Sequence, residues 1–223
     1  MTQLAERQQR ITRPGVVDGA AKRALDIVIS MALIIVLGPL LILLWSAVRC
    51  TSPGPALFRQ QRLGRDRQPF TVLKLRTMYA DNNDQIHRDY ITKMLKDGRP
   101  QAAKSSGLFK LDADPRITPL GAWLRRTSLD ELPQLLNVLA GQMSLVGPRP
   151  VLAWEEELFT DAHRHRFDVK PGITGLWQVS GRSKLSMQQA LELDDEYVGR
   201  RSLALDLVIL ARTVPALLRG GAT

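Results

Sequence analysis

The sequence is poor in residue types on which several classes of protein depend. Its single cysteine, Cys50, excludes an internal disulfide and is consistent with a reducing compartment. The three histidines, His87, His163 and His165, lack metal-ligand spacing with cysteine or acidic residues, so we interpret them as surface or structural residues. Aromatic residues make up only 5% of the chain, whereas nucleic-acid surfaces favour basic residues interleaved with aromatics. We therefore expect no nucleic-acid partner.

Positive charge is present, but it is concentrated near the N-terminus. Residues 1–76 carry twelve Lys or Arg against four Asp or Glu, whereas the remainder carries nineteen against eighteen. A basic first third beside a neutral body favours contact with an anionic membrane surface, and membrane lipids are the expected partner. A hydrophobic content of 44% in 223 residues is enough for a folded core, so wholesale disorder is excluded.

One uncharged apolar run extends over residues 27–48, after Lys22-Arg23 and before Arg49. Its length fits a transmembrane helix of about 20 residues and exceeds the apolar core of a signal peptide. Gly38-Pro39 lies at its middle, and Pro39 cannot donate a helical hydrogen bond, so a kink is expected there. Both flanks are basic, so the charge bias favours neither orientation. A re-entrant, hairpin-like helix satisfies both flanks, and a kinked spanning helix is the alternative.

The remaining sequence predicts one domain. We divide the chain into a polar N-terminal tail (1–21), a membrane helix (22–50) and one folded domain (51–223). Residues 56–58 and 70–75 are typical of short strands on either side of a basic turn that contains Gly64. Residues 202–218 are apolar but interrupted by charges and a proline, which favours either an amphipathic helix at the membrane surface or a helix packed into the core.

Three segments carry candidate functional side chains. Lys74 and Arg76 alternate along a predicted strand, so they share a face that suits either an anion or solvent. Arg149 lies between two prolines, which restrict its backbone and suit a rigid guanidinium mount, or a purely structural turn. A glycine-rich loop over residues 170–182 has basic ends, the second of which is Arg182. Its glycines permit close approach of the backbone to a ligand.

The segment Thr127–Gln134 places Asp130 and Glu131 directly before Pro133, which is best tolerated in the first turn of a helix. The unpaired N–H groups of a helix start favour negative charge and bind phosphate. The ordinary alternative is a capping role, because Ser128 and Glu131 have the spacing of a capping box. The residues alone leave both interpretations open.

Taken in order, the motifs resemble those of the bacterial polyprenyl-phosphate hexose-1-phosphate transferases, the small monotopic phosphoglycosyl transferase family. The resemblance covers roughly residues 20–215. It rests on Lys22-Arg23-x-x-Asp26 with the apolar run, Lys74-Leu75-Arg76-Thr77-Met78, Arg125-Arg126-Thr127-Ser128-Leu129-Asp130-Glu131-Leu132-Pro133-Gln134, Asn137, Met143-Ser144-Leu145-Val146-Gly147-Pro148-Arg149-Pro150, and Pro171-Gly172-Ile173-Thr174-Gly175.

The resemblance implies a fold that is mainly α with a few short strands. It comprises a re-entrant, proline-kinked membrane helix and a small catalytic domain with interfacial amphipathic helices, on the cytoplasmic face of the bacterial inner membrane. It also implies that Asp130 attacks the β-phosphate of a UDP-sugar, and that undecaprenyl phosphate then accepts the phosphosugar. Glu131 would help to hold Mg²⁺, and Arg125 and Arg149 match positions lining the phosphate site. A second copy of the chain is a further candidate partner.

Two points qualify these expectations. The family usually has Ser-Pro at the kink, whereas this chain has Gly38-Pro39, and glycine supplies flexibility but no side chain that can cap the freed backbone groups. Residues 175–182 look more like members that start exopolysaccharide or O-antigen synthesis with glucose or galactose. A membrane-anchored scaffold that binds acidic lipids or glycans is the alternative from a different class of protein.

Overall fold

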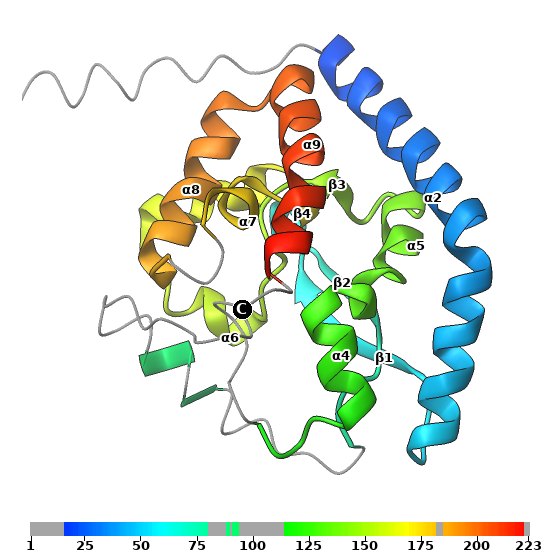
Figure 1. Cartoon of the computed structure of the whole chain (residues 1–223). Helices are drawn as coiled ribbons and strands as arrows, with labels where there is room; N and C mark the ends of the chain where they lie inside the picture. The colour runs from blue at the N-terminus through cyan, green and yellow to red at the C-terminus, as the bar shows by residue number, and fades with distance from the viewer. Residues whose placement is uncertain (1–15, 80–87, 90, 94–113, 182–184, 221–223) are drawn as a thin grey trace, which may run out of the picture.

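A computed structural model describes residues 16–79, 88–89, 91–93, 114–181 and 185–220, and all structural statements below refer to these residues (Figure 1). The described part is mostly helical with a few short strands, as predicted. The elements in chain order are α2 (Val16–Thr51), β1 (Leu57–Leu63), η1 (Arg65–Arg67), β2 (Pro69–Leu75), α4 (Pro119–Thr127), η2 (Leu129–Glu131), α5 (Gln134–Leu139), β3 (Ser144–Val146), α6 (Ala153–Glu156), η3 (Asp161–Asp168), β4 (Gly172–Thr174), α7 (Leu176–Ser180), α8 (Met187–Arg200) and α9 (Leu203–Gly220).

Helix α2 contains the apolar run and continues through Pro39 without interruption. The ribbon of α2 follows one side of the molecule and does not fold back on itself (Figure 1). Among the described helices, it is the one long and apolar enough to cross a membrane by length and composition. Large apolar side chains are exposed along it, among them Val28, Ile35, Val36 and Ile42. Whether its ends lie on one side of a membrane stays a prediction.

The N-terminal half of α2 is attached to the rest of the chain by three polar side chains within two turns. Lys22 donates to Asp206 at 2.6 Å and to the Val146 carbonyl at 3.1 Å. Arg23 donates to the last carbonyls of α5, where positive charge is favourable. Asp26 is buried and accepts hydrogen bonds from the Ser144 hydroxyl and the Leu145 N–H of the β3 strand. These bonds fix α2 against β3 and α5.

The C-terminal half of α2 packs against the same domain through apolar side chains. Leu44 and Val48 are buried in a cluster with Ala56, Leu75 and Leu124. The two contact regions are separated along α2 by Gly38-Pro39. Both halves of the apolar helix therefore contact the rest of the described chain.

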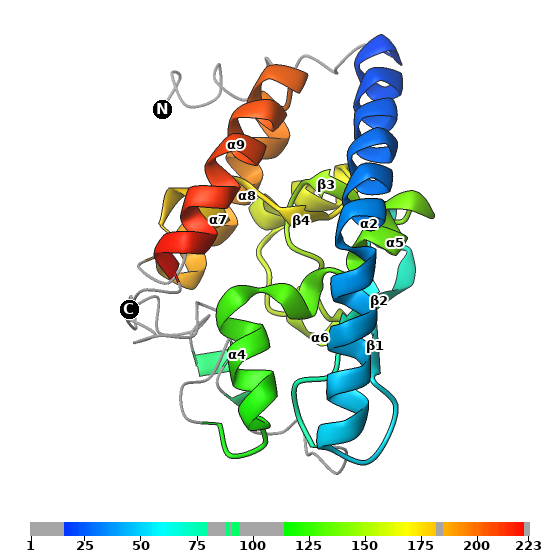
Figure 2. The same ribbon diagram turned by 45° about the vertical axis from the view of Figure 1, so that its right-hand side comes forward.

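Two small sheets lie beside α2. β1 and β2 form an antiparallel hairpin in which Leu57 pairs with Leu75 and Leu63 with Pro69, which confirms the two predicted strands around the Gly64 turn. β3 and β4 pair in parallel, with Ser144 opposite Gly172. α2 and α9 flank this pair from opposite sides (Figure 2).

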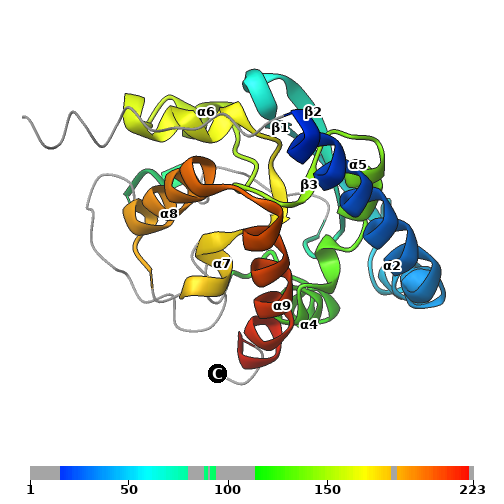
Figure 3. The same ribbon diagram turned by 90° about the horizontal axis from the view of Figure 1, so that it is seen from above.

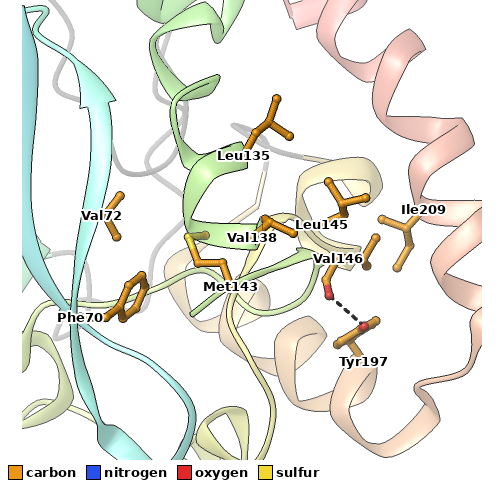
Figure 4. Close-up of a cluster of buried hydrophobic side chains, with 9 residues drawn as sticks. All are labelled: Phe70, Val72, Leu135, Val138, Met143, Leu145, Val146, Tyr197 and Ile209. Atoms are coloured by element: carbon orange, nitrogen blue, oxygen red, sulfur yellow. Dashed lines mark hydrogen bonds between the residues drawn. The ribbon is translucent and has the colours of Figure 1, made fainter. Parts of the chain in front are cut away.

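The central core joins both sheets to α5, α8 and α9 (Figure 4). Its buried members are Phe70, Val72, Leu135, Val138, Met143, Leu145, Val146, Tyr197 and Ile209. The Tyr197 hydroxyl is within hydrogen-bonding distance of both Asp206, at 2.7 Å, and the Val146 carbonyl, at 3.2 Å. Burial and the Asp206 carboxylate raise the pKa of Tyr197, so it remains a neutral donor to that carboxylate.

Helix α9 has one face in this core and another exposed. Ile209 and Asp206 are buried, whereas Leu207, Val208 and Val214 are exposed. α9 also contacts α4, which lies beside the C-terminal half of α9 (Figure 3). Packing into the core, one of the two sequence alternatives, is therefore confirmed, and contact of the exposed face with a membrane stays a prediction.

Candidate active site

Asp130 and Glu131 lie in a strained connection between two helices. α4 is capped at its start by Thr118, whose hydroxyl accepts from the Gly121 N–H at 2.9 Å. It ends at Ser128, which has the left-handed conformation (φ 58°) that disfavours residues with a β-carbon. The single turn η2 follows, and α5 begins directly after Pro133. The carboxylates therefore precede a short helix, as predicted from Pro133.

The two carboxylates have different surroundings. Asp130 is 4% exposed. Glu131 is half-buried, and its carboxylate accepts from the Lys74 ammonium group of β2 at 2.7 Å. The structure thus brings together Lys74 and Glu131, two predicted site residues that are 57 positions apart in the sequence.

Arg125 lies close enough to Asp130 for electrostatic attraction. Burial lowers the pKa of Arg125, while the Asp130 and Asp114 carboxylates act in the opposite direction. Arg149 and Arg116 add repulsion to the same guanidinium group. Arg125 and Arg149, both predicted to bind phosphate, therefore belong to one charged cluster around Arg125, which also includes Asp130. Repelling cations held close together are suited to an additional anion.

The cluster also includes the Asp114–Arg116 ion pair, which the sequence analysis did not place near the site. Asp114 accepts from the Arg116 guanidinium at 2.7 Å, and these hydrogen bonds lower the pKa of Asp114. The aspartate and proline of this segment are typical of a turn, so the pattern gave no sign of electrostatic contact with Arg125.

Arg149 projects from a segment held by its backbone. The Pro148, Arg149 and Pro150 carbonyls accept from the Gly172 N–H, from Arg166 and from Arg62, at 2.8, 2.9 and 3.1 Å respectively. The loop glycines serve close backbone packing here, because a β-carbon built on Gly172 would lie 2.1 Å from the Gly147 nitrogen. The predicted rigid mount for Arg149 therefore consists of these hydrogen bonds as well as the two prolines.

The two arginines that hold this segment are buried with carboxylates. Arg166 is paired with Asp194 at 2.7 Å, and Arg62 lies 3.7 Å from Glu155. Burial raises the pKa of Asp194 to about 6, although Arg166 opposes that rise. None of these four residues stood out in the sequence, because isolated charges on helices and strands usually indicate solvent exposure.

No described contact places the remaining predicted phosphate ligands, Arg76 and Arg182, in this cluster. The Arg76 guanidinium donates to the carbonyl and hydroxyl oxygens of Ser52, both at 2.7 Å, so Arg76 and Lys74 contact different partners. Burial, together with repulsion from Arg49, lowers the pKa of Arg76. Arg182 lies outside the described residues. Their roles in phosphate binding stay predictions.

The donor set suits Mg²⁺ only if the substrate also contributes oxygen ligands. No group of three metal-ligating side chains occurs among the described residues. Mg²⁺, however, is commonly bound through one or two carboxylates together with substrate phosphates and water. Glu131 is partly exposed beside the buried Asp130, so it fits that mode of binding.

Comparison with known proteins defines the class of this site. The model of the bacterial sugar transferase family matches residues 17–220. The chain is 40% identical over 201 residues to the exopolysaccharide production protein ExoY of Sinorhizobium fredii, covering 90% of this chain and 86% of that protein. The chain therefore belongs to the bacterial sugar transferase family, which confirms the resemblance seen in its motifs.

Two further relatives have names that state a reaction. An undecaprenyl-phosphate galactose phosphotransferase of Salmonella typhimurium is 41% identical over 198 residues, covering 89% of this chain and 40% of that protein. A UDP-glucose:undecaprenyl-phosphate glucose-1-phosphate transferase of Caulobacter vibrioides is 40% identical over 213 residues, covering 92% and 72%. The chain thus matches most of some relatives and less than half of others.

Proposed function

We propose that this protein is a phosphoglycosyl transferase that moves a sugar-1-phosphate, from UDP-glucose or UDP-galactose, to undecaprenyl phosphate. The observation that carries the proposal is the buried Asp130 beside Arg125, with the Lys74–Glu131 pair in the next position of the same turn. The names of the relatives supply the donor and acceptor classes. The product would start the synthesis of an exopolysaccharide, capsule or O-antigen.

The reaction takes two displacements at one phosphorus atom. In the first, a carboxylate oxygen of Asp130 forms a bond to the β-phosphorus of the UDP-sugar. The bond from that phosphorus to the bridging oxygen breaks, and UMP leaves with the electron pair. In the second, a phosphate oxygen of undecaprenyl phosphate attacks the same phosphorus, and the Asp130 carboxylate is released. A covalent intermediate of this kind divides one transfer into two steps with ping-pong kinetics.

The surrounding cations stabilise negative charge that grows on the diphosphate. Arg125 and Arg149 are suited to bidentate contact with phosphate oxygens, and Lys74 adds a mobile positive charge. Glu131 would hold Mg²⁺, which supplies further neutralisation of the diphosphate. Lys74 contacts Glu131 at 2.7 Å, so its ammonium group lies beside the carboxylate that would hold the metal.

The contacts of α2 support a re-entrant placement of this helix. Residues on both sides of Pro39, such as Asp26 and Val48, are buried against the same catalytic domain. A soluble domain lies on one side of a bilayer, so a helix that kept both contacts would enter and leave on that side. We place that side at the cytoplasmic face of the bacterial inner membrane, where UDP-sugars are made.

Labelling of introduced cysteines tests this topology. In a Cys50→Ser background, Gly19→Cys and Arg65→Cys are expected to react with a membrane-impermeant maleimide in inside-out vesicles and to be protected in intact cells. Val36→Cys, on the exposed apolar face, serves as the control that lipid shields in both preparations. Labelling of the first two positions from opposite sides would identify a spanning helix.

The reaction is tested by donor selection. We expect purified protein in detergent, with Mg²⁺ and undecaprenyl phosphate, to transfer labelled sugar-1-phosphate from UDP-glucose or UDP-galactose into the lipid fraction. UMP should be released in an amount equal to that of the sugar phosphate transferred. Chelation of Mg²⁺ by EDTA should stop the transfer. Absence of lipid-linked label from every UDP-sugar supplied, with the protein folded and membrane-bound, would favour the scaffold alternative.

A further inference from the structure

The segment that carries Arg149 is held by two buried ion pairs that the proposed reaction does not use. Nη2 of Arg166 contacts two acceptors: the Arg149 carbonyl at 2.9 Å and the Asp194 carboxylate at 2.7 Å. The Arg166 and Asp194 side chains are each 3% exposed. Arg166 comes from η3 and Asp194 from α8, two elements that pack directly against each other. One guanidinium nitrogen therefore links the site segment to the α8 helix.

We propose that the Arg166–Asp194 pair is a positioning unit, which fixes the direction in which Arg149 presents its guanidinium group to the donor diphosphate. Arg166 holds the carbonyl of Arg149 itself, and Asp194 holds Arg166. Neither residue touches substrate. The inference rests on the proposed function for the identity of the ligand, and on the described contacts for the positioning.

The geometry of the Arg166–Asp194 pair is poor for an ion pair whose only role is to stabilise the fold. Nη1 of Arg166 is buried and has no hydrogen-bond partner among the described residues, whereas Asp194 also accepts from the Arg149 backbone. Burial of two charges costs free energy that one contact does not fully offset, and replacement of such pairs by apolar residues is often neutral or stabilising. The hydrogen bond to a backbone carbonyl of the site, in contrast, is one that no apolar pair can replace.

A second buried pair holds the neighbouring residue in the same way. Arg62 donates to the Pro150 carbonyl and lies 3.7 Å from Glu155. Glu155 in turn accepts from the Leu152 N–H at 2.8 Å, so its carboxylate is tied to the chain just after the segment. A buried arginine paired with a carboxylate therefore holds each of two consecutive carbonyls, those of Arg149 and Pro150.

Arg149 and Arg166 also line one shared hollow in the surface, with Leu63, Gly64, Pro148, Phe167, Val169 and Pro171.

The double substitution Arg166→Met/Asp194→Leu separates positioning from folding. It removes both charges together, so we expect a melting temperature close to that of the wild type. Loss of the hydrogen bond to the Arg149 carbonyl is expected to lower kcat/KM for the UDP-sugar about tenfold, the usual effect of one hydrogen bond from a charged group. If this variant does not fold, Arg166→Lys provides the same comparison, because lysine keeps the charge beside Asp194 but loses the planar guanidinium geometry.

Leu191→Ala is the matched control on α8. Leu191 is buried in the cluster that joins α8 to η3, and it is not part of either ion pair. A cavity there should lower the melting temperature without a change in kcat/KM for the donor. An equal loss of kcat/KM in the control would mean that any weakening of α8 disturbs the site, and would overturn the positioning role.

Hydrogen exchange gives a readout that does not depend on turnover. In the folded double variant, the amides of Gly147, Arg149, Val151 and Leu152 should exchange faster than in the wild type, while those of β2 remain unchanged. A folded variant with unchanged exchange in that segment, or with unchanged kcat/KM for the donor, contradicts the proposal. If the wild type itself transfers no sugar phosphate, the proposed function fails, and the exchange result alone decides whether the pair holds the segment.

Discussion

Asp130→Asn is expected to abolish transfer of sugar-1-phosphate to undecaprenyl phosphate, with a loss of about 10³-fold or more in kcat. Asparagine has nearly the same shape, so the buried side chain still fits, but its amide oxygen is a far weaker nucleophile than a carboxylate oxygen. The fold and the membrane attachment should persist, because α2 is held by Asp26 and Lys22 at a different place. Assay of lipid-linked label and of membrane-bound protein measures both properties.

The covalent step has its own signature in the absence of acceptor. Wild-type protein incubated with UDP-sugar labelled in the β-phosphate should retain label that hydroxylamine releases, as expected of an acyl phosphate, and Asp130→Asn should retain none. Asp161→Asn, at an aspartate that is 98% exposed, is the control and should behave as the wild type. Near-normal turnover by Asp130→Asn would rule out this residue as the nucleophile.

Gly172→Ala is expected to cause the largest loss of stability among single substitutions in the site segments, about 3 kcal/mol. The added β-carbon would lie 2.1 Å from the Gly147 nitrogen and 2.4 Å from the Thr174 carbonyl oxygen. Both obstacles are backbone atoms, so they cannot rotate away as a side chain can. Relief of the overlap requires separation of β3 from β4, and the Pro148 carbonyl then loses its hydrogen bond. Thermal unfolding in detergent measures the effect.

Gly199→Ala provides the comparison for the same chemical change. Gly199 is exposed in α8, and a β-carbon there meets no atom within 4 Å. Alanine should therefore raise stability by about 0.5–1 kcal/mol, because it loses less backbone freedom on folding than glycine does. Equal melting temperatures for the two variants would mean that the close contact of β3 with β4 is absent in solution.

The sequence predicted well the structural features that depend on residues close together in the chain. The β1–β2 hairpin follows from two apolar segments around a glycine-containing turn, and the helix after Pro133 follows from the fixed backbone angle of proline. Both properties depend on residues that are neighbours in the chain. The grouping of Asp130, Glu131 and Arg125 is predictable for the same reason, since all lie within one short connection.

Contacts between distant segments could not be predicted from patterning. Lys74 and Arg76 alternate on one strand, yet one contacts Glu131 and the other Ser52, because the strand ends at Leu75 and the chain turns away. The pairing of Arg166 with Asp194 depends on how η3 packs on α8. A sequence records each charge of such a pair but not its burial, so both look like ordinary surface residues.

The attachment of α2 at two places has a geometric consequence. Asp26 and Leu44 are 18 residues apart, or about 27 Å along a helix that turns by about 100° per residue. The segment between them therefore has a fixed length and a fixed rotation, and one inserted residue would rotate one of the two contacts by about 100° away from the core. The two contacts fix the rotation of α2 about its own axis. The domain therefore also fixes the direction in which the exposed apolar face of α2 points. Catalytic domain and anchor must consequently tilt as one rigid body, so that Asp130 keeps a fixed position relative to the helix whenever the helix changes its angle.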